Sequence, residues 1–144
     1  ARLTVLGKGS EEASLKQMAK ELGVSDSVCF TGSVDNDKVP ALYRQSDIFL
    51  NTSSVDNMPI SVLEAFACGL PVISANTGGL RYMVEDGKTG FLTNFNDHNA
   101  MAERVFGLLE SQEQAKRISA DAREYVKSFS WDNVRGKWAE VYTV

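Results

Sequence analysis

The 144-residue sequence contains few of the residues that mark special classes of protein, with two cysteines, three prolines and one histidine. Cys29 and Cys68 are far apart, and neither stands in a CxxC or Cys/His cluster, which gives metal and redox sites little support. We expect both cysteines to be buried apolar fillers. His98 lies in the polar run NFNDHNA at a predicted helix start, where we expect a solvated residue and not a general base.

Long hydrophobic runs are absent as well. No apolar run approaches the ~20 residues that span a bilayer. The first residues, ARLTVLG, have neither a basic region nor a cleavage site. The sequence therefore predicts neither a membrane span nor a signal peptide, and we expect a cytoplasmic location.

The sequence has no excess of positive charge, because 15 basic residues stand against 19 acidic ones and the net charge is −4. No run rich in lysine or arginine appears, which argues against nucleic acid as the main partner. An anionic ligand would have to be held locally. Backbone amides at helix N-termini supply positive potential without basic side chains.

What the sequence does contain is a series of short β-rich runs that alternate with helical patterns, which is typical of a parallel sheet with crossover helices. We expect one domain over residues 1–144. After Thr93 the apolar spacing predicts only helices, the last of them with an apolar stripe of Trp131, Val134, Trp138, Val141 and Tyr142. The predicted strands are Arg2–Leu6, Val28–Thr31, Ile48–Asn51, Pro71–Ser74 and Gly90–Thr93.

Four shorter helices are predicted between these strands. The first has Ser10 as its expected N-cap and Gly23 as the residue after its C-cap. The second contains Val39, Leu42 and Tyr43 on its apolar face. The third spans Ile60 to Cys68, and the fourth spans Gly79 to Val84.

Ligands of open α/β sheets bind at the carboxyl ends of the strands, so the loops there are the candidate sites. After the first strand, Gly7-Lys8-Gly9-Ser10 forms a GxG turn in which missing Cβ atoms would let a ligand approach the backbone. The full dinucleotide fingerprint is absent, and a merely structural turn is the alternative.

The third strand ends in the polar loop NTSSVDNMP, which enters a helix beginning near Pro59. The amides of Ile60 and Ser61 would then point outward unpaired, as a site suited to a diphosphate. Glu64 lies five residues after Pro59, ~7.5 Å from it along the helix axis, where a carboxylate can accept from two vicinal hydroxyls. In the alternative interpretation, Asp56 and Asn57 only cap the helix and Glu64 is a solvated face residue.

The run DNMPISVLEAFACGLPVISANTGG resembles the donor-site signature of the retaining, family-4-like glycosyltransferases (glycosyl transferases group 1), which have a type B architecture of two Rossmann domains. The resemblance extends over nearly the full chain, through LGKGSE, VCFTGSV, DIFLNTS, EDGKTGFL and FSWDNV. The signature is an acidic residue, seven residues, a glutamate, Ala-x-Ala-x-Gly-x-Pro-Val and a Gly-Gly turn, represented by Asp56, Glu64, Ala65, Ala67, Gly69, Pro71, Val72, Gly78 and Gly79.

The resemblance implies the donor-binding domain of a hexosyltransferase in carbohydrate or polysaccharide biosynthesis, with a three-layer α/β/α parallel sheet and extra C-terminal helices. The substrate would be a nucleotide sugar, UDP-linked in our expectation, and neither a metal nor another cofactor would be needed. Asp56 would face the transferred sugar as the catalytic residue, and Glu64 would hold the ribose hydroxyls. Val34 would contact the base through its backbone, and the other implied donor-binding residues are Gly7, Gly9, Asn57, Met58, Pro59, Ile60 and Ser61.

Three residues depart from the family pattern. Asp56 stands where the family usually has a glutamate, Pro59 replaces a common glycine, and Tyr82 stands where many members carry a glutamate. These departures keep open an alternative of a non-catalytic domain whose degenerate site only binds a nucleotide or a partner. A signalling receiver is excluded, because Asp47 begins a strand instead of ending it and the acidic cluster of a receiver is lacking.

Family members also have an additional first strand, a loop with a diphosphate-binding arginine and lysine, and an N-terminal acceptor domain. Without that central strand, we expect the sheet to close up into a flavodoxin-like order or to borrow a strand from another molecule. We expect the isolated chain to have negligible turnover and to self-associate through the apolar stripe of the last helix. Any peripheral membrane contact would go through the N-terminal domain.

Overall fold

The structure, a computed structural model, describes residues 1–142. The chain divides into two compact units, Ala1–Pro40 and Ala41–Val144, each with its own parallel sheet. The boundary falls inside the short helix α2 (Val39–Arg44).

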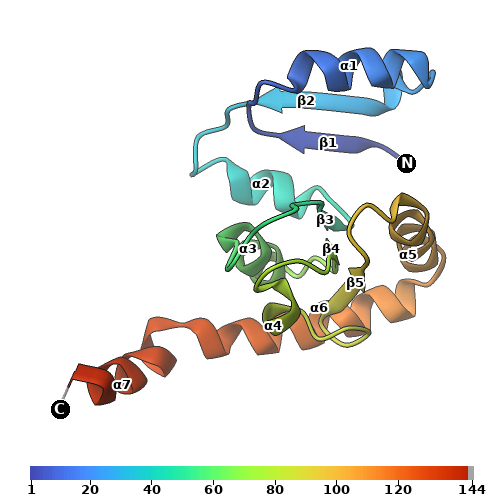
Figure 1. Cartoon of the computed structure of the whole chain (residues 1–144). Helices are drawn as coiled ribbons and strands as arrows, with labels where there is room; N and C mark the ends of the chain where they lie inside the picture. The colour runs from blue at the N-terminus through green and yellow to red at the C-terminus, as the bar shows by residue number, and fades with distance from the viewer. Residues whose placement is uncertain (143–144) are drawn as a thin grey trace. The chain divides into compact units, whose positions relative to one another are not determined.

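The N-terminal unit is a βαβ unit. Strand β1 (Leu3–Leu6) pairs in parallel with β2 (Val28–Gly32), and α1 (Glu12–Glu21) with the 3₁₀ turn η1 (Ser25–Ser27) connects them (Figure 1). Gly23 follows the C-cap of α1 with φ +68°, as predicted from the left-handed conformation that glycine accepts there. The predicted Ser10 cap is wrong: Glu11 occupies the N-cap, and its carboxylate accepts from the hydroxyls of Ser10 and Ser14.

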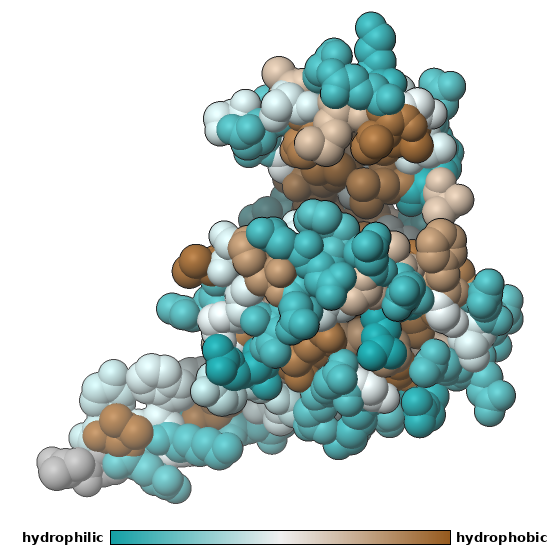
Figure 2. All heavy atoms as spheres, turned by 45° about the vertical axis from the view of Figure 1, so that its right-hand side comes forward, coloured by the Kyte–Doolittle hydropathy of each residue, from teal (hydrophilic) through white to brown (hydrophobic). Residues whose placement is uncertain are grey.

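Most apolar side chains of the N-terminal unit are exposed, and Figure 2 shows hydrophobic side chains at its surface. The expectation that Cys29 is a buried filler is wrong, because this residue is exposed. Successive side chains of a strand point to opposite faces of a sheet. Phe30 lies beneath the α1 residue Lys16, whose Nζ is 5.4 Å from the ring centroid, so Cys29 lies on the face away from α1. Cys68, in the other unit, is half-buried.

The C-terminal unit has three parallel strands in the order β3-β4-β5. These strands are β3 (Phe49–Asn51), β4 (Val72–Ala75) and β5 (Gly90–Thr93), with Asn51 opposite Ser74 and Ala75 opposite Thr93. Helix α3 (Ile60–Cys68) connects β3 to β4, and α4 (Leu80–Met83) connects β4 to β5. Every residue of β4 is buried, as expected for a strand paired on both edges and covered by helices.

Three helices follow the last strand: α5 (His98–Glu110), α6 (Gln112–Val126) and, after the 3₁₀ turn η2 (Lys127–Phe129), α7 (Trp131–Tyr142). Helices α3 and α5 lie on opposite sides of the three-stranded sheet (Figure 1). One core cluster joins Ile73 and Phe91 of the sheet to Leu108 of α5 and Ile118 of α6. In α7, Trp131, Trp138 and Val141 are exposed, so the predicted apolar stripe lacks a cover among the described residues.

The α/β class with parallel strands and crossover helices is confirmed, and each predicted strand agrees with the structure within one residue at either end. The expected closure into one flavodoxin-like sheet is not found, because the strands of residues 1–142 form two separate sheets. None of the described helices combines the length and the hydrophobicity needed to cross a membrane.

Candidate functional site

Two loops at the carboxyl edge of the β3–β5 sheet are bonded to each other. The loop of residues 52–59 follows β3, and the loop of residues 76–79 follows β4. The Thr77 hydroxyl donates to the Ser53 carbonyl at 2.8 Å, and the Gly79 amide donates to the Asp56 carbonyl at 2.9 Å. The second loop therefore fixes the backbone of the first at both its start and its middle.

The absence of side chains in the Gly78-Gly79 pair is required by this contact. A Cβ atom on Gly78 would lie 2.1 Å from the Asp56 carbonyl oxygen, and one on Gly79 would lie 1.8 Å from that of Asn57. Gly78 also has φ +52°, in the left-handed region. The Gly-Gly turn of the signature thus positions the 52–59 loop.

Asp56 is half-buried in this loop, and its Oδ1 accepts from the Met58 amide at 3.2 Å. An aspartate that bonds the amide two residues ahead stabilises a tight turn. The N-cap of α3 is Pro59, and no side chain caps the helix. The interpretation in which Asp56 and Asn57 only cap the helix is therefore wrong.

The first turn of α3 presents free amides beyond Pro59. Pro59 is the N-cap rather than the first helical residue, and its carbonyl accepts from the Val62 amide at 3.1 Å. The amides of Ile60 and Ser61 precede that first bond of the helix and have no intrahelical acceptor. The aligned peptide dipoles add positive potential at this end, so the local structure favours an anion.

Glu64 lies on the exposed surface of α3, but it is not an isolated solvated residue. Its Oε2 accepts a hydrogen bond of 3.1 Å from the hydroxyl of Tyr43, which lies on α2. The same hydroxyl lies 3.4 Å from the Ser61 carbonyl. The other carboxylate oxygen, Oε1, has no partner among residues 1–142 and can accept from a ligand.

Tyr43 is the site residue that the sequence reasoning missed, since it was assigned only to an apolar helix face. Its side chain is buried, and its ring centroid lies 5.8 Å from that of Phe49. Burial, and then the hydrogen bond to Glu64, raise the pKa of Tyr43 well above its usual 10.0. A buried tyrosine needs a partner for its hydroxyl, which is the one signal that could have pointed to this contact.

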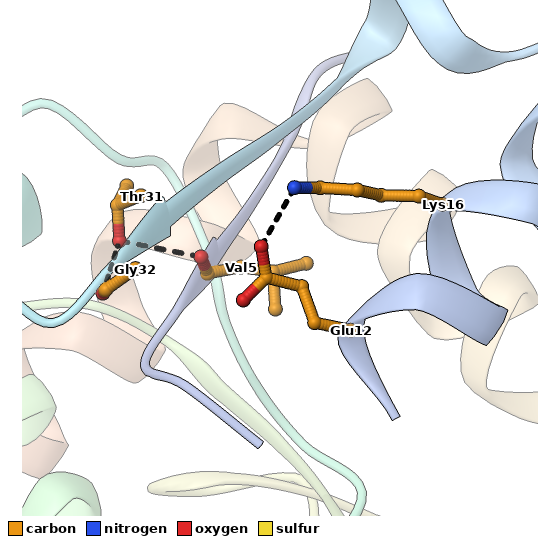
Figure 3. Close-up of polar contacts among 5 residues, drawn as sticks. All are labelled: Val5, Glu12, Lys16, Thr31 and Gly32. Carbon is orange, nitrogen blue, oxygen red and sulfur yellow. Dashed lines mark hydrogen bonds and ion pairs between the residues drawn. The ribbon is translucent and has the colours of Figure 1, made fainter. Parts of the chain in front are cut away.

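The remaining predicted site residues lie in the N-terminal unit. Gly7 has φ +122° and donates to the Gly32 carbonyl at 3.0 Å, so the ends of β1 and β2 stay together. Figure 3 shows the Thr31 hydroxyl between the carbonyls of Val5 and Gly32, at 3.3 and 3.0 Å. Nothing lies within 4 Å of a Cβ built on Gly7 or on Gly9, and Val34 is half-buried in the loop after β2.

Figure 3 also shows the ion pair of Lys16 and Glu12 in α1, at 2.6 Å. It joins two residues one helical turn apart on the surface, and such pairs stabilise a helix only slightly. No group of three or more metal-ligating side chains occurs within residues 1–142.

The C-terminal unit carries three groups in α3 and the loop before it: a helix end that favours an anion, the half-buried carboxylate of Asp56 and the carboxylate of Glu64, which is hydrogen-bonded to Tyr43. The first can bind phosphate oxygens, and a carboxylate can accept from hydroxyl groups. A ligand that combines phosphates with vicinal hydroxyls suits this arrangement.

Comparison with known proteins agrees with this chemistry. The sequence profile of the family described as "Glycosyl transferases group 1" matches residues 1–125. The chain is 32% identical over 143 residues to N-acetyl-alpha-D-glucosaminyl L-malate synthase of Bacillus anthracis, covering 99% of this chain and 37% of that protein. It is 33% identical over 148 residues to a GDP-mannose-dependent alpha-(1-6)-phosphatidylinositol monomannoside mannosyltransferase of Mycobacterium tuberculosis, covering 97% and 38%.

Among solved structures, the chain resembles Anabaena Alr3699/HepE in complex with UDP, with a TM-score of 0.92 and 25% identity. The match covers 99% of this chain and 41% of that one. The chain therefore spans less than half the length of the relatives that it matches.

Proposed function

Because the chain belongs to the glycosyl transferases group 1 family, we propose that it is the donor-binding part of a retaining glycosyltransferase that transfers a hexose from a UDP-linked sugar. The observation that carries this proposal is the position of Glu64 on α3. Its carboxylate accepts a hydrogen bond from Tyr43 of α2. Glu64 lies on the same helix as Ile60 and Ser61, whose amides are free for a diphosphate.

The diphosphate, the ribose and the transferred sugar each have a proposed counterpart in the C-terminal unit. The amides at the start of α3 bind the diphosphate, and Glu64 accepts from the two ribose hydroxyls. Asp56, in the loop just before the helix, contacts the hydroxyls of the transferred sugar.

The catalytic contribution of this part of the enzyme is electrostatic. As the bond between the sugar and the diphosphate breaks, negative charge develops on the departing phosphate. Amides that already point at that position stabilise the charge without reorganising, and no metal is required for this. The retention of the anomeric configuration and the choice of acceptor depend on the whole enzyme, and this chain provides the donor-binding side.

The nucleotide is proposed to be UDP because the HepE structure, which matches 99% of the chain, contains UDP. The mycobacterial relative is described as GDP-mannose-dependent, which makes GDP the competing choice. Calorimetric titration of the chain with UDP-glucose, UDP-N-acetylglucosamine and GDP-mannose distinguishes the two. We expect the uridine-linked sugars to bind more tightly, and preference for GDP-mannose would contradict the choice of UDP.

A second candidate function is binding without catalysis, and Pro59 is the observation in its favour. As the N-cap of α3, Pro59 has no N–H to offer the ligand, where the family commonly has a glycine. Sugar transfer by the full-length protein would exclude this candidate. Tight nucleotide-sugar binding with no transfer or hydrolysis would support it.

A further inference from the structure

We propose that Tyr43 is a positioning residue that fixes the Glu64 carboxylate in the orientation that accepts the ribose hydroxyls. The inference rests on the proposed function, because it assigns Glu64 to the ribose. Tyr43 itself does not touch the substrate in this account. It acts only through Glu64.

Tyr43 is held by packing, whereas Glu64 lies on the exposed surface of α3. Tyr43 is 8% exposed, and its ring packs against Phe49 at 5.8 Å between centroids, which immobilises it. Glu64 is exposed, and a free glutamate on a helix surface samples several rotamers. The hydrogen bond of 3.1 Å between the Tyr43 hydroxyl and Glu64 Oε2 selects among those rotamers before the ligand arrives.

The Tyr43 hydroxyl is also a chemically suitable hydrogen-bond donor to Glu64. A neutral phenol occupies one lone pair of Oε2 and leaves Oε1 and the negative charge available for a ligand. A lysine or an arginine in its place would compete with the ribose by neutralising the carboxylate. Because the pKa of Tyr43 is raised by burial and then by Glu64, the phenol stays protonated and remains a donor at neutral and mildly alkaline pH.

The substitution that tests this role is Tyr43→Phe, which removes only the hydroxyl and keeps the buried ring. Titration of the chain with UDP and with 2′,3′-dideoxy-UDP separates positioning from packing. We expect the affinity for UDP to fall about three- to tenfold, because one hydrogen bond is lost. The affinity for the dideoxy nucleotide should stay unchanged. In a Glu64→Ala background, Tyr43→Phe should have no further effect on UDP binding.

A matched control is Tyr125→Phe, since Tyr125 also donates from a partly buried phenol, to the Tyr82 carbonyl at 3.2 Å. It should leave both affinities unchanged. If Tyr43→Phe weakens UDP and dideoxy-UDP equally, the role is structural and the inference is wrong. If the parent chain prefers UDP over dideoxy-UDP and Tyr43→Phe keeps that preference in full, the inference fails while the proposed function stands.

A parent chain that binds UDP and dideoxy-UDP equally would contradict the ribose role of Glu64 itself, and with it the inference.

A crystal structure of the parent chain with UDP tests the same role without any variant. We expect Tyr43 to remain hydrogen-bonded to Glu64 Oε2, with the ribose on Oε1. A carboxylate turned away from Tyr43 toward the ribose would overturn the inference.

Discussion

The amide of Gly79 donates to the carbonyl of Asp56 at 2.9 Å, and this bond holds the candidate catalytic loop against the turn after β4. The contact is so close that a Cβ atom on Gly79 would lie 1.8 Å from the Asn57 carbonyl oxygen. Real Cβ atoms do not approach an oxygen that closely, so the loop can keep its position only if residue 79 has no side chain.

Gly79→Ala should therefore displace the 52–59 loop. We expect the chain to remain folded, because the loop lies at the surface, and to bind UDP-glucose at least tenfold more weakly. Circular dichroism checks the fold, and calorimetry measures the binding.

The matched control is Gly107→Ala in the interior of α5, where an added Cβ meets nothing within 4 Å. Alanine is the better helix former, so this variant should gain about 0.5–1 kcal/mol in the free energy of unfolding and keep its affinity. Unchanged UDP-glucose binding in Gly79→Ala would show that the turn does not position the loop for the ligand.

Asp56→Asn separates a contact with the sugar from a role in the turn. Asparagine keeps the side-chain oxygen that accepts from the Met58 amide, so the turn should survive with a loss of stability within about 1 kcal/mol. Affinity for UDP should stay nearly unchanged, whereas affinity for the intact UDP-sugar should fall, because only that ligand carries the hydroxyls that Asp56 is proposed to contact. Equal responses of the two ligands would place Asp56 outside the sugar site.

In the full-length enzyme, Asp56→Glu restores the acid that the family usually has at this position. The extra methylene moves the carboxylate by about one ångström, and near-attack geometry is sensitive to such a displacement. We expect a change in kcat larger than the change in the dissociation constant of the donor. Steady-state kinetics with two different donors would contradict the assignment if rate and donor selectivity both stayed constant.

Alkaline pH should destabilise the fold through Tyr43. Its pKa is raised in the folded chain by burial and then by Glu64, so folding favours the neutral phenol. The resulting stability is fully present below the unfolded pKa of about 10 and is lost as pH rises above it.

Urea unfolding at about pH 8 and at about pH 11 should therefore show a smaller loss of stability in Tyr43→Phe than in the parent. Burial also raises the pKa of Tyr125, which contributes in the same direction in both proteins. An equally steep loss in the variant and the parent would mean that Tyr43 ionises as it does in the unfolded chain.

Self-association is expected through α7. Trp131, Trp138 and Val141 are 68%, 53% and 67% exposed, and together with the half-buried Val134 they form an apolar stripe on one helix. Sedimentation velocity over a range of concentrations should show dimers that Trp138→Glu abolishes. A parent chain that remains monomeric at high concentration would contradict this expectation.

Local patterns in the sequence were sufficient to predict the strands and the start of α3, because short runs of β-branched, aromatic and leucine residues bounded by turn residues leave few alternatives. They failed at the start of α1, where Ser10 is not the N-cap. Glu11 is the N-cap, and its carboxylate accepts from the hydroxyls of Ser10 and Ser14. The exposure of Cys29 was missed because the sequence does not say which face of β2 a helix covers.

The candidate site was only partly predictable. The signature makes Asp56 and Glu64 candidate site residues. The contact of Glu64 with Tyr43 joins residues 21 positions apart and depends on how α2 lies against α3. The Gly-Gly turn was recognised as a motif, and its steric reason follows from the position of the 52–59 loop. The Tyr43–Glu64 hydrogen bond and the close approach of Gly79 to the 52–59 loop both join distant parts of the sequence, so no local pattern predicts them.

We propose that the chain binds a nucleoside diphosphate sugar and that Glu64 accepts from the ribose hydroxyls. Calorimetry with UDP and 2′,3′-dideoxy-UDP on three proteins tests this role of Glu64: the parent, Glu64→Ala and the control Glu103→Ala. Glu103 is an exposed glutamate of α5. Charge-assisted hydrogen bonds are worth about 1.5–3 kcal/mol each, so Glu64→Ala should weaken UDP binding at least tenfold. Dideoxy-UDP should bind the parent and Glu64→Ala equally, and Glu103→Ala should match the parent with both ligands. Equal affinity of the parent for UDP and dideoxy-UDP would show that Glu64 does not bind the ribose.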